Sequence, residues 1–404
     1  MAWQSLEAVE MAVRRREDGR PGEFGAHPLR GVRVLRPVRR LLKRLRPAGT
    51  ARDKAGNREL FYDQYMTLLL FRMACPALRS MRALQQATGW DAVRRRLGIG
   101  RVSLGSLSES AAVFDPELVR PIIAELARRA APLESGPRAA ALRGLTAVDG
   151  SVFKVASRLN WALWNGPGAR AAKLHLHFEV FKSTPCRASV TAAIGSETAE
   201  LRAAVEPGRL YVVDRGYVDY ALFGEIVRAG SSLIARVKDN TAFVVAEERP
   251  VGEAARAAGV VRDAALSRLG TSHHKDEIRR PMRLVVVATT GRDGEPGEVW
   301  LITDRLDLEA ELIAEGYRLR WTVELFFRWM KLLMGAGHLL SHSRNGATLH
   351  LYAALIVSLL IVLRSGRKPT KRTLEAIQFY ILGWVTGAEF DAHLEGLKRL
   401  EKAD

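Results

Sequence analysis

The sequence predicts an α/β protein built on a mixed β-sheet, with helical regions before and after it. After Pro137 the chain changes to short β-branched runs, the first three in direct succession and the later ones alternating with a helix. The segments before Pro137 and from residue 308 onward instead repeat apolar residues at helical spacing. Hydrophobic residues make up 48% of the 404, which excludes a mainly disordered chain.

The charge of the chain is strongly positive. There are 62 basic and 44 acidic residues, a formal net charge of +18. This excess favours a polyanionic partner, with nucleic acid ahead of an anionic membrane. The alternative is an arginine-rich composition that only reflects a GC-biased genome. Two cysteines, Cys75 and Cys186, exclude a disulfide framework and a cysteine-based zinc site within one chain.

Residues 1–58 form a predicted basic arm. Between Arg30 and Arg52 there are nine basic residues and no acidic one. Pro37 can begin a helix there and Pro47 can end it. Apolar residues recur at helical spacing in the same segment: Leu35, Val38, Leu42 and Leu45. The arm either binds DNA or is a solvated surface helix or a loosely ordered tail.

Residues 59–140 form a predicted helical region. Helices are expected over 61–74, which is amphipathic, over 81–88, and after Asp115-Pro116 through residue 129. A small helical module on a basic chain can read DNA through one helix in a groove, so we expect this region to bind DNA.

The predicted sheet begins at residue 141. Strands are expected over 145–155, 174–181, 188–194, 210–214 and 232–237, with a helix near 217–229. Residues 141–238 are therefore the first part of a core, and 239–298 are a turn-rich insertion ending in strands near 283–289 and 298–303. Helices over 308–334 and 347–364 belong to the second part of the core, 299–364, and 365–404 are a C-terminal helical region. The apolar run 351–363 is too short to span a bilayer, which favours a buried helix in a cytosolic protein with no membrane contact.

Two aspartates lie in unusual places on the predicted strands. Asp149 lies inside an apolar strand, and Asp214 ends another. A carboxylate on a strand buried on both faces is costly unless it is paired or ligates a metal ion. The alternative for each residue alone is an aspartate that caps a turn.

Four residues of the helix predicted over 308–334 share one face. At 100° per residue they fall within an arc of about 60°, and they are Tyr317, Arg320, Glu324 and Lys331. A polar stripe on a helix otherwise rich in Leu, Phe and Trp indicates a polar, anionic neighbour. The alternative is a salt-bridge face, since Arg320 and Glu324 stand four residues apart.

The pattern Y-x2-R-x3-E-x6-K formed by these four residues resembles the signature of the YREK group of DDE transposases, the insertion-sequence-four family. Asp149 in TAVDGS and Asp214 in YVVDRGY resemble the first and second acidic blocks of that family. The resemblance covers roughly residues 142–363. It implies a ribonuclease H-like catalytic core with Asp149 on the first strand, Asp214 on the fourth and Glu324 on a later helix. The 110 residues between Asp214 and Glu324 leave room for the β-rich insertion expected in this family, at 239–298.

The resemblance also implies the reaction. A family member binds the terminal inverted repeats of its element, cleaves the ends by metal-dependent hydrolysis, here through a hairpin intermediate, and joins the 3′-hydroxyl ends to target DNA. Asp149, Asp214 and Glu324 would hold two Mg²⁺ ions, with Mn²⁺ as a substitute. Further residues would contact DNA phosphates: Arg320, Lys331, Tyr317 and, unless it is an ordinary surface cation, Arg215.

Trp300 falls just before the Glu324 helix. In relatives a Trp at a similar place stacks on a base flipped out of the DNA end, which hairpin formation requires. The alternative is a core aromatic residue of a buried strand.

The resemblance further implies a homodimer on double-stranded DNA, in the nucleoid-associated cytoplasm of a bacterium. We expect the contact on the C-terminal helices, where an apolar stripe comprises Leu374, Ile377, Ile381 and Leu382. The alternative for this stripe is packing on the chain's own core.

Two other functions remain open. One is a structure-selective, Mg²⁺-dependent nuclease of the same fold. The other is a non-catalytic DNA-binding protein descended from a transposase, although a complete set of three acidic residues argues against it. Terminal inverted repeats beside the coding sequence would separate a transposase from a nuclease.

Overall fold

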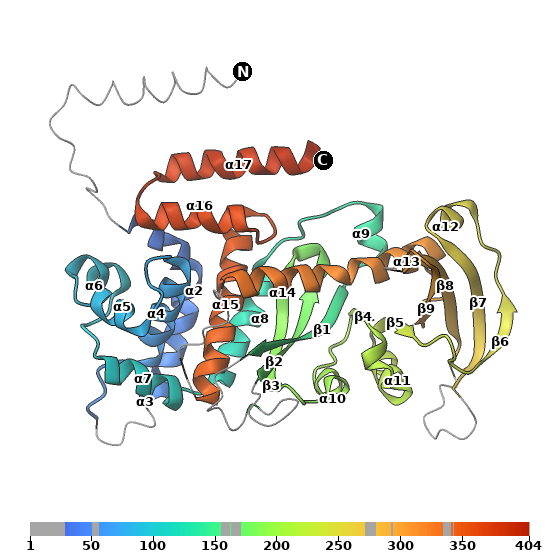
Figure 1. Cartoon of the computed structure of the whole chain (residues 1–404), viewed down its shortest axis with the longest axis horizontal. Coiled ribbons are helices and arrows are strands. Elements are labelled where there is room, and N and C mark those ends of the chain that lie inside the picture. Colours follow the sequence, from blue (N-terminus) through green and yellow to red (C-terminus); the bar gives the residue numbers. More distant parts are fainter. Residues whose placement is uncertain are drawn as a thin grey trace, which may run out of the picture.

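A nine-stranded mixed sheet organises the chain and confirms the predicted mixed α/β class (Figure 1). The computed structural model describes residues 29–50, 56–154, 162, 171–270, 280–291, 294–333, 341 and 343–403. Its strands are β1 (Leu145–Lys154), β2 (Ala171–Glu179), β3 (Thr184–Ala192), β4 (Leu210–Val213), β5 (Ser232–Val237), β6 (Phe243–Glu248), β7 (Val260–Leu269), β8 (Met282–Thr290) and β9 (Pro296–Thr303).

The sheet order is β3-β2-β1-β4-β5-β9-β8-β7-β6. Strands β1, β4 and β5 run parallel to one another, and all other neighbours are antiparallel. Val212 of β4 belongs to one hydrophobic cluster, whereas Tyr211 and Val213 belong to another on the opposite face. Because both faces of β4 are buried, its sequence is continuously apolar and the first polar side chain appears where the strand ends.

Helices cover both faces of this sheet (Figure 1). One face packs against α8 (Arg120–Arg129), α13 (Ala310–Leu319), α14 (Trp321–Leu333) and α15 (Arg344–Ser365). The other face holds α10 (Glu197–Arg202) and α11 (Tyr220–Arg228). The helix expected near 217–229 is therefore confirmed as α11, whereas α10 was not predicted.

The segment 239–298 contributes strands that continue the same sheet. Strand β9 pairs with β5, and β8, β7 and β6 follow outward, with the short helix α12 (Glu253–Ala257) beside them. The two predicted strands are confirmed as β8 and β9. Strands β6 and β7 were not predicted individually, because β6 is an edge strand with mostly exposed side chains and therefore lacks a buried apolar face.

A buried ion pair fixes this part of the sheet to the helix that follows it. Arg283 of β8 is 2% exposed, and its Nε and Nη2 donate to the two carboxylate oxygens of Asp263 on β7 at 2.7 and 2.6 Å. Its Nη1 donates to the carbonyl oxygen of Leu308, just before α13. One guanidinium therefore joins two strands to the approach of the next helix.

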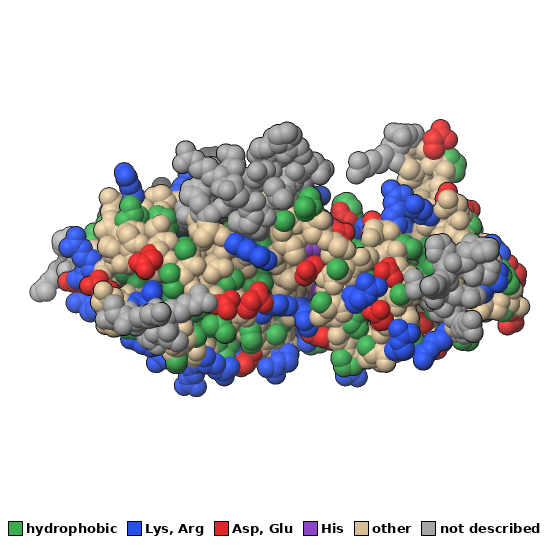
Figure 2. All heavy atoms as spheres, turned by 90° about the horizontal axis from the view of Figure 1, so that it is seen from below, with side chains coloured by type: hydrophobic (Ala, Val, Ile, Leu, Met, Phe, Trp, Pro, Cys, Tyr) green, Lys and Arg blue, Asp and Glu red, His purple; other side chains and the backbone are tan. Residues whose placement is uncertain are grey.

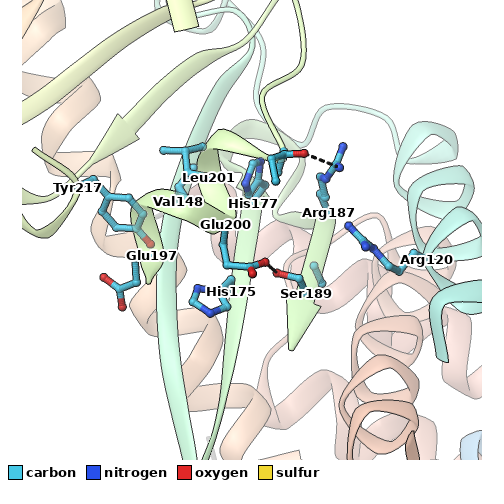
Figure 3. A pocket seen from close by; sticks show the side chains of 13 residues that line it. Arg120, Val148, His175, His177, Arg187, Ser189, Glu197, Glu200, Leu201 and Tyr217 are labelled. Carbon is cyan, nitrogen blue, oxygen red and sulfur yellow. Dashed lines mark hydrogen bonds between the residues drawn. The ribbon is translucent and has the colours of Figure 1, made fainter. Parts of the chain in front are cut away.

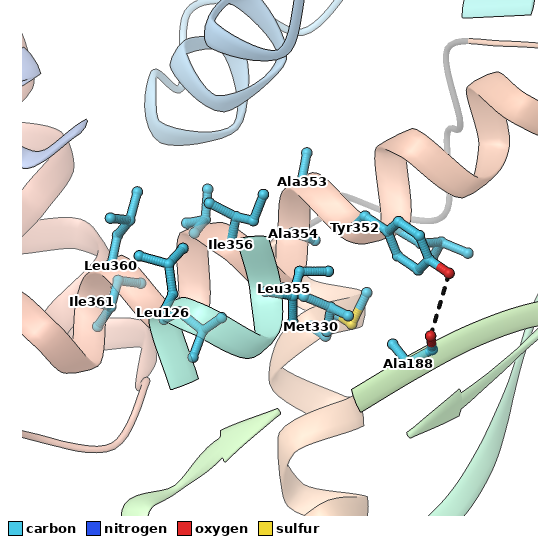
Figure 4. Close-up of a cluster of buried hydrophobic side chains, with 14 of the residues drawn as sticks. Leu126, Ala188, Met330, Tyr352, Ala353, Ala354, Leu355, Ile356, Leu360 and Ile361 are labelled. Atoms are coloured by element: carbon cyan, nitrogen blue, oxygen red, sulfur yellow. Dashed lines mark hydrogen bonds between the residues drawn. The ribbon is translucent and has the colours of Figure 1, made fainter. Parts of the chain in front are cut away.

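The central helix α15 is longer than the predicted 347–364. Of the helices in the described ranges, it alone is long and apolar enough to cross a membrane. However, 94% of its most apolar 18-residue stretch is buried inside the protein. Its neighbours include Leu126 of α8 and Met330 of α14 (Figure 4), and the Tyr352 hydroxyl donates to the Ala188 carbonyl at 3.4 Å. The expectation that this segment is too short to span a bilayer is wrong, because the helix is longer than its apolar run. The predicted buried helix is confirmed.

The N-terminal segment is folded and packed, so the loosely ordered tail is wrong for residues 30–50, whereas DNA binding by the arm stays a prediction. From Arg30 it forms η1 (Arg30–Leu35), α2 (Arg36–Leu42), η2 (Lys43–Leu45) and α3 (Arg46–Thr50). The four apolar residues at helical spacing are at most 3% exposed and belong to the main hydrophobic cluster. This segment is part of the core, and only its basic face is solvated. The rest of the predicted arm, 1–28 and 51–55, lies outside the described residues.

The helical region after it contains α4 (Tyr62–Ala74), α5 (Met81–Ala87), α6 (Asp91–Leu97), α7 (Leu104–Val113), η3 (Pro116–Val119), α8 and α9 (Pro137–Ala141). These helices confirm the predicted ones near 61–74, 81–88 and 116–129. The predicted amphipathic character of the first is wrong, because α4 lies between α2 and α15 and is buried on nearly every side.

The C-terminal helices are α16 (Lys371–Leu382) and α17 (Gly387–Ala403). Within the apolar stripe of α16, Leu374, Ile377 and Ile381 are at most 6% exposed. They pack toward η1 and α4 of the same chain. The expectation that this stripe contacts a second subunit is therefore wrong, because the N-terminal segment already covers it.

Candidate active site

Asp149 lies in the middle of β1 and Asp214 directly follows β4, near the point where the parallel pairing of these two strands ends. Strands β1 and β4 are in register up to the pair Ala147 and Val212, and Asp149 and Asp214 each follow two residues later. Neighbouring strands are about 5 Å apart, so the two residues stand side by side. The backbone N–H of the next residue donates to each carboxylate at 2.8 Å.

The helical stripe lies over these two strands, although the predicted single helix is divided. The break falls at Arg320, between α13 and α14. The N–H of Arg320 bonds to the Tyr317 carbonyl at 3.0 Å, and the N–H of Val323 bonds to the Arg320 carbonyl at 3.2 Å. These bonds span three residues instead of four and tighten one turn. Arg320 keeps helical angles (φ −53°, ψ −34°), so the two helices run on as nearly one (Figure 1).

The stripe contacts Asp214 and carries one internal ion pair. The Tyr317 hydroxyl donates to Asp214 Oδ1 at 3.2 Å, and Arg320 Nη2 donates to Glu324 Oε1 at 2.8 Å. Arg320 is largely buried and its positive charge also acts on Asp149. The structure therefore brings together five of the predicted residues, Asp149 and Asp214 among them.

Asp149 is electrostatically unusual. Burial raises its pKa to about 6, and the negative charges of Glu324 and Glu197 add to the rise. The Gly150 N–H and the charge of Arg320 act in the opposite direction. The raised pKa of Asp149 therefore comes mainly from the removal of its carboxyl group from water.

This pKa makes Asp149 costly to the folded, metal-free chain at neutral pH. Between pH 3.8, the ordinary pKa of an aspartate, and about pH 6, the Asp149 carboxyl group keeps its proton in the folded state. In the unfolded state it has lost this proton. The stability from this proton is present below pH 4 and is lost as the pH rises to 6. Asp149→Asn should therefore raise the free energy of unfolding by about 2 kcal/mol at pH 7 and by little at pH 4, measured by urea denaturation with EDTA.

Asp219 serves as the control for this prediction. Although burial opposes the shift, hydrogen bonds from the Leu222 N–H and from Arg202 lower its pKa. Asp219→Asn should accordingly destabilise the chain at pH 7. Equal destabilisation by both substitutions at pH 7 would contradict the unfavourable burial of the charged Asp149 carboxylate.

The remaining predicted residues lie farther out. Lys331 is exposed, with its Nζ 5.4 Å from the ring centroid of Phe153 on β1. Arg215 is exposed and lines a surface hollow with Lys238 and other residues. Arg215 contacts Asp214 only through its backbone N–H, and within the described ranges neither side chain forms a hydrogen bond or ion pair with the three carboxylates.

Trp300 is half-buried on β9, opposite Val237 of β5 and Val286 of β8. Its ring packs on Phe243 with centroids 5.9 Å apart, and its Nε1 donates to Glu298 Oε2 at 2.9 Å. It joins the hydrophobic cluster on the α11 face, whereas α13 and α14 cover the other face. The structure therefore does not bring Trp300 together with the three acidic residues.

Two residues near the aspartates were missed. Arg236 Nη1 lies 3.8 Å from Asp214 Oδ1, since β5 is parallel to β4 and Arg236 stands one residue past the pair of Val213 and Ala235. The other is Glu197, at the start of α10. The strand pairing would have indicated Arg236, whereas no motif marks Glu197.

The donor set fits a hard divalent cation, because all three predicted ligands are carboxylates. Within the described ranges, no group of three or more His, Cys, Asp or Glu side chains is arranged to hold a metal ion. Instead, Arg320 and Arg236 lie beside Glu324 and Asp214.

Comparison with known proteins identifies the family. The family model described as "Transposase DDE domain" matches residues 141–360, more than half of the chain. The chain belongs to this family. The matched DDE domain contains both aspartates and Glu324, and membership implies dependence on a divalent metal ion in general.

Two curated relatives of this DDE family chain are transposases by name. A putative transposase y4zB of Sinorhizobium fredii (strain NBRC 101917 / NGR234) is 28% identical over 58% of this chain and 64% of its own length. A probable transposase for insertion sequence element IS5377 of Geobacillus stearothermophilus is 26% identical over 58% of this chain and 61% of its own length. The match therefore spans less than two thirds of either relative.

Among solved structures, a piggyBac transposase synaptic complex with hairpin DNA aligns with a TM-score of 0.37 at 12% identity. The alignment covers 92% of this chain and 81% of that one. This similarity is too low to support a comparison of the two sites.

Proposed function

We propose that the chain is the transposase of an insertion sequence and a member of the YREK group of the insertion-sequence-four family. The observation that supports this most is the approach of one helical stripe to the two aspartates of β1 and β4, with Tyr317 donating to Asp214 and Arg320 pairing with Glu324. The order β3-β2-β1-β4-β5, with β1 antiparallel to β2 and parallel to β4, supports the ribonuclease H-like core that the resemblance implies.

Asp149, Asp214 and Glu324 are the proposed ligands of two Mg²⁺ ions, with Mn²⁺ as a substitute. The bound ions would supply activation of water or a 3′-hydroxyl and stabilisation of the leaving oxygen. Glu324 Oε1 accepts from Arg320, and the second carboxylate oxygen would serve as the ligand. The guanidinium has further donors, with which it would contact a DNA phosphate.

The other proposed phosphate contacts are Tyr317, Lys331 and Arg215. Lys331 and Arg215 are exposed, and so are free to meet a backbone that crosses the site. Basic side chains lie along the whole length of the face seen in Figure 2, with acidic ones among them. This distribution of basic side chains along the face suits a long duplex better than a compact anion.

The proposed reaction is binding of the terminal inverted repeats, cleavage at the ends through a hairpin, and joining of the 3′-hydroxyl ends to target DNA. It would be carried out by a homodimer on DNA in the bacterial cytoplasm. A structure-selective nuclease would cut junctions without needing the repeats, and a non-catalytic derivative would bind them without cutting.

A cleavage assay on duplexes that carry the element ends tests this function and the role of Trp300 together. We expect the wild-type chain to produce first a nick and then a hairpin in Mg²⁺, and neither product in EDTA. Trp300→Ala removes a stacking surface worth about 1–3 kcal/mol, so the nick should form normally while hairpin product falls.

The same assay has clear contrary outcomes. Equal cutting of duplexes without the repeats would favour the nuclease. A uniform fall of every step in Trp300→Ala, with loss of soluble protein, would assign Trp300 to the sheet packing seen around Phe243. Phe243→Leu is the matched control, since it alters that packing and leaves the indole in place.

A further inference from the structure

Glu197 lies beside the two predicted aspartates. It is the first residue of α10, whose N-cap is Ser196. A Cβ built on Gly150 would lie 2.8 Å from Glu197 Oε1, and one built on Gly216 would lie 3.5 Å from Oε2. Gly150 directly follows Asp149, and Gly216 is two residues past Asp214. The Glu197 carboxylate therefore lies between the backbone segments that leave the two aspartates, and the absence of a side chain at residue 150 lets it approach.

The charge of Glu197 is only partly balanced by its neighbours. Lys173 Nζ lies 3.3 Å from Oε1, and both side chains are partly exposed. Lys173 also donates to the Gly195 carbonyl at 3.4 Å, so it does not depend on Glu197 alone. The negative charge of Glu197 acts on Asp149 and on Tyr217.

Tyr217 provides an independent sign of a missing partner. It is 2% exposed, and its hydroxyl is buried with no hydrogen-bond partner among the described residues. Figure 3 shows the ring next to Glu197, with the hydroxyl directed into the pocket beneath α10. Burial and the nearby negative charges of Glu197 and Asp149 raise the pKa of Tyr217 well above its ordinary value, so the phenol keeps its proton. A buried donor left unpaired destabilises the fold, which favours a bound partner at this place.

We propose that Glu197 is a fourth carboxylate of the divalent-ion site, with the Tyr217 hydroxyl as a donor to the water that accompanies the ion. The proposal rests on the function proposed above and extends its three-residue acidic set by one. Glu197 attracts the cation from the α10 face, whereas Glu324 approaches from the α14 face. Lys173 holds the Glu197 side chain and competes with the cation for it.

Glu200 offers a matched control on the same helix. It lines the same pocket, but its carboxylate accepts from the Ser189 hydroxyl at 2.5 Å, on the side away from Tyr217 (Figure 3). Glu200→Gln removes one negative charge from α10, as Glu197→Gln does. It leaves the surroundings of Asp149 unchanged.

The test is a Mn²⁺ titration of the full chain, with free Mn²⁺ followed by electron paramagnetic resonance. Glu197→Gln should weaken binding roughly tenfold, as loss of a supporting carboxylate does at other metal sites, and Glu200→Gln should bind within about twofold of wild type. Asp149→Asn should weaken binding more than either. Melting temperatures measured in EDTA show whether each variant is folded.

The outcomes separate this inference from the function on which it rests. Wild-type affinity in Glu197→Gln together with weak binding in Asp149→Asn would overturn the role of Glu197 alone. Wild-type affinity in both would overturn the proposed metal site as well. If Glu197→Gln does not fold, the Mn²⁺ titration of Lys173→Met tests the role of Glu197 instead. The proposal expects equal or tighter Mn²⁺ binding once the competing cation is gone, and weaker binding would contradict it.

Discussion

Cleavage of end DNA should fall at least about a thousandfold in each of Asp149→Asn, Asp214→Asn and Glu324→Gln. Each change removes one negative charge from the proposed ion site and keeps the size of the side chain. A thousandfold loss corresponds to about 4 kcal/mol of transition-state stabilisation, within what a metal ion supplies to phosphoryl transfer. Binding of the ends should stay near the wild-type level, because no DNA-facing cation is altered. Rates come from a single-turnover cleavage assay and affinities from a gel-shift titration.

Glu315→Gln is the matched control for these variants. Glu315 lies on α13, in the helix pair that carries Glu324, but its carboxylate pairs with Arg138 at 2.7 Å. It should cleave at the wild-type rate. Near wild-type cleavage by any of the three acidic-residue variants in Mg²⁺ would remove that residue from the site.

Loss of the buried Arg283–Asp263 pair should have the largest effect on stability. Arg283→Met leaves Asp263, which is 3% exposed, without its bidentate partner, and the Leu308 carbonyl loses a donor. Breaking a buried pair from one side typically costs about 3–5 kcal/mol. We expect this fall in the free energy of unfolding, measured by urea denaturation.

Two further variants test this explanation. The double variant Asp263→Leu with Arg283→Met should recover much of the loss, because no unpaired charge remains. Arg262→Met breaks an exposed pair with Glu248 on the neighbouring strands and should cost less than about 1 kcal/mol. A free energy of unfolding of Arg283→Met within about 1 kcal/mol of the wild-type value would contradict the role of this pair in holding β7, β8 and α13 together.

The sequence could predict Asp149 and Asp214 because each signal is local. Both faces of β1 and β4 are covered, so their sequences are apolar and an acidic residue stands out. The four-residue stripe was predictable from helical geometry. The tightened turn at Arg320 was not, since its three-residue hydrogen bonds still leave helical angles and preserve the spacing.

The missed features depend on contacts between distant segments. Arg236 reaches Asp214 only because β5 pairs with β4, and Glu197 reaches Gly150 only because α10 packs beside β1. The same limit explains the errors at the two ends of the chain. The apolar residues of η1 and α2 and those of α16 looked like free faces, yet η1 and α16 pack together within one chain.

The most direct test of the central claim, that three carboxylates from two strands and one helix hold one divalent-ion site, is to map the ion on the chain. Fe²⁺ bound in place of Mg²⁺ generates hydroxyl radicals with ascorbate and peroxide, and these cut the backbone beside the ion. We predict cuts next to Asp149, Asp214 and Glu324 that excess Mg²⁺ suppresses. Cuts confined to other segments, or cuts at these residues that Mg²⁺ does not suppress, would contradict the site.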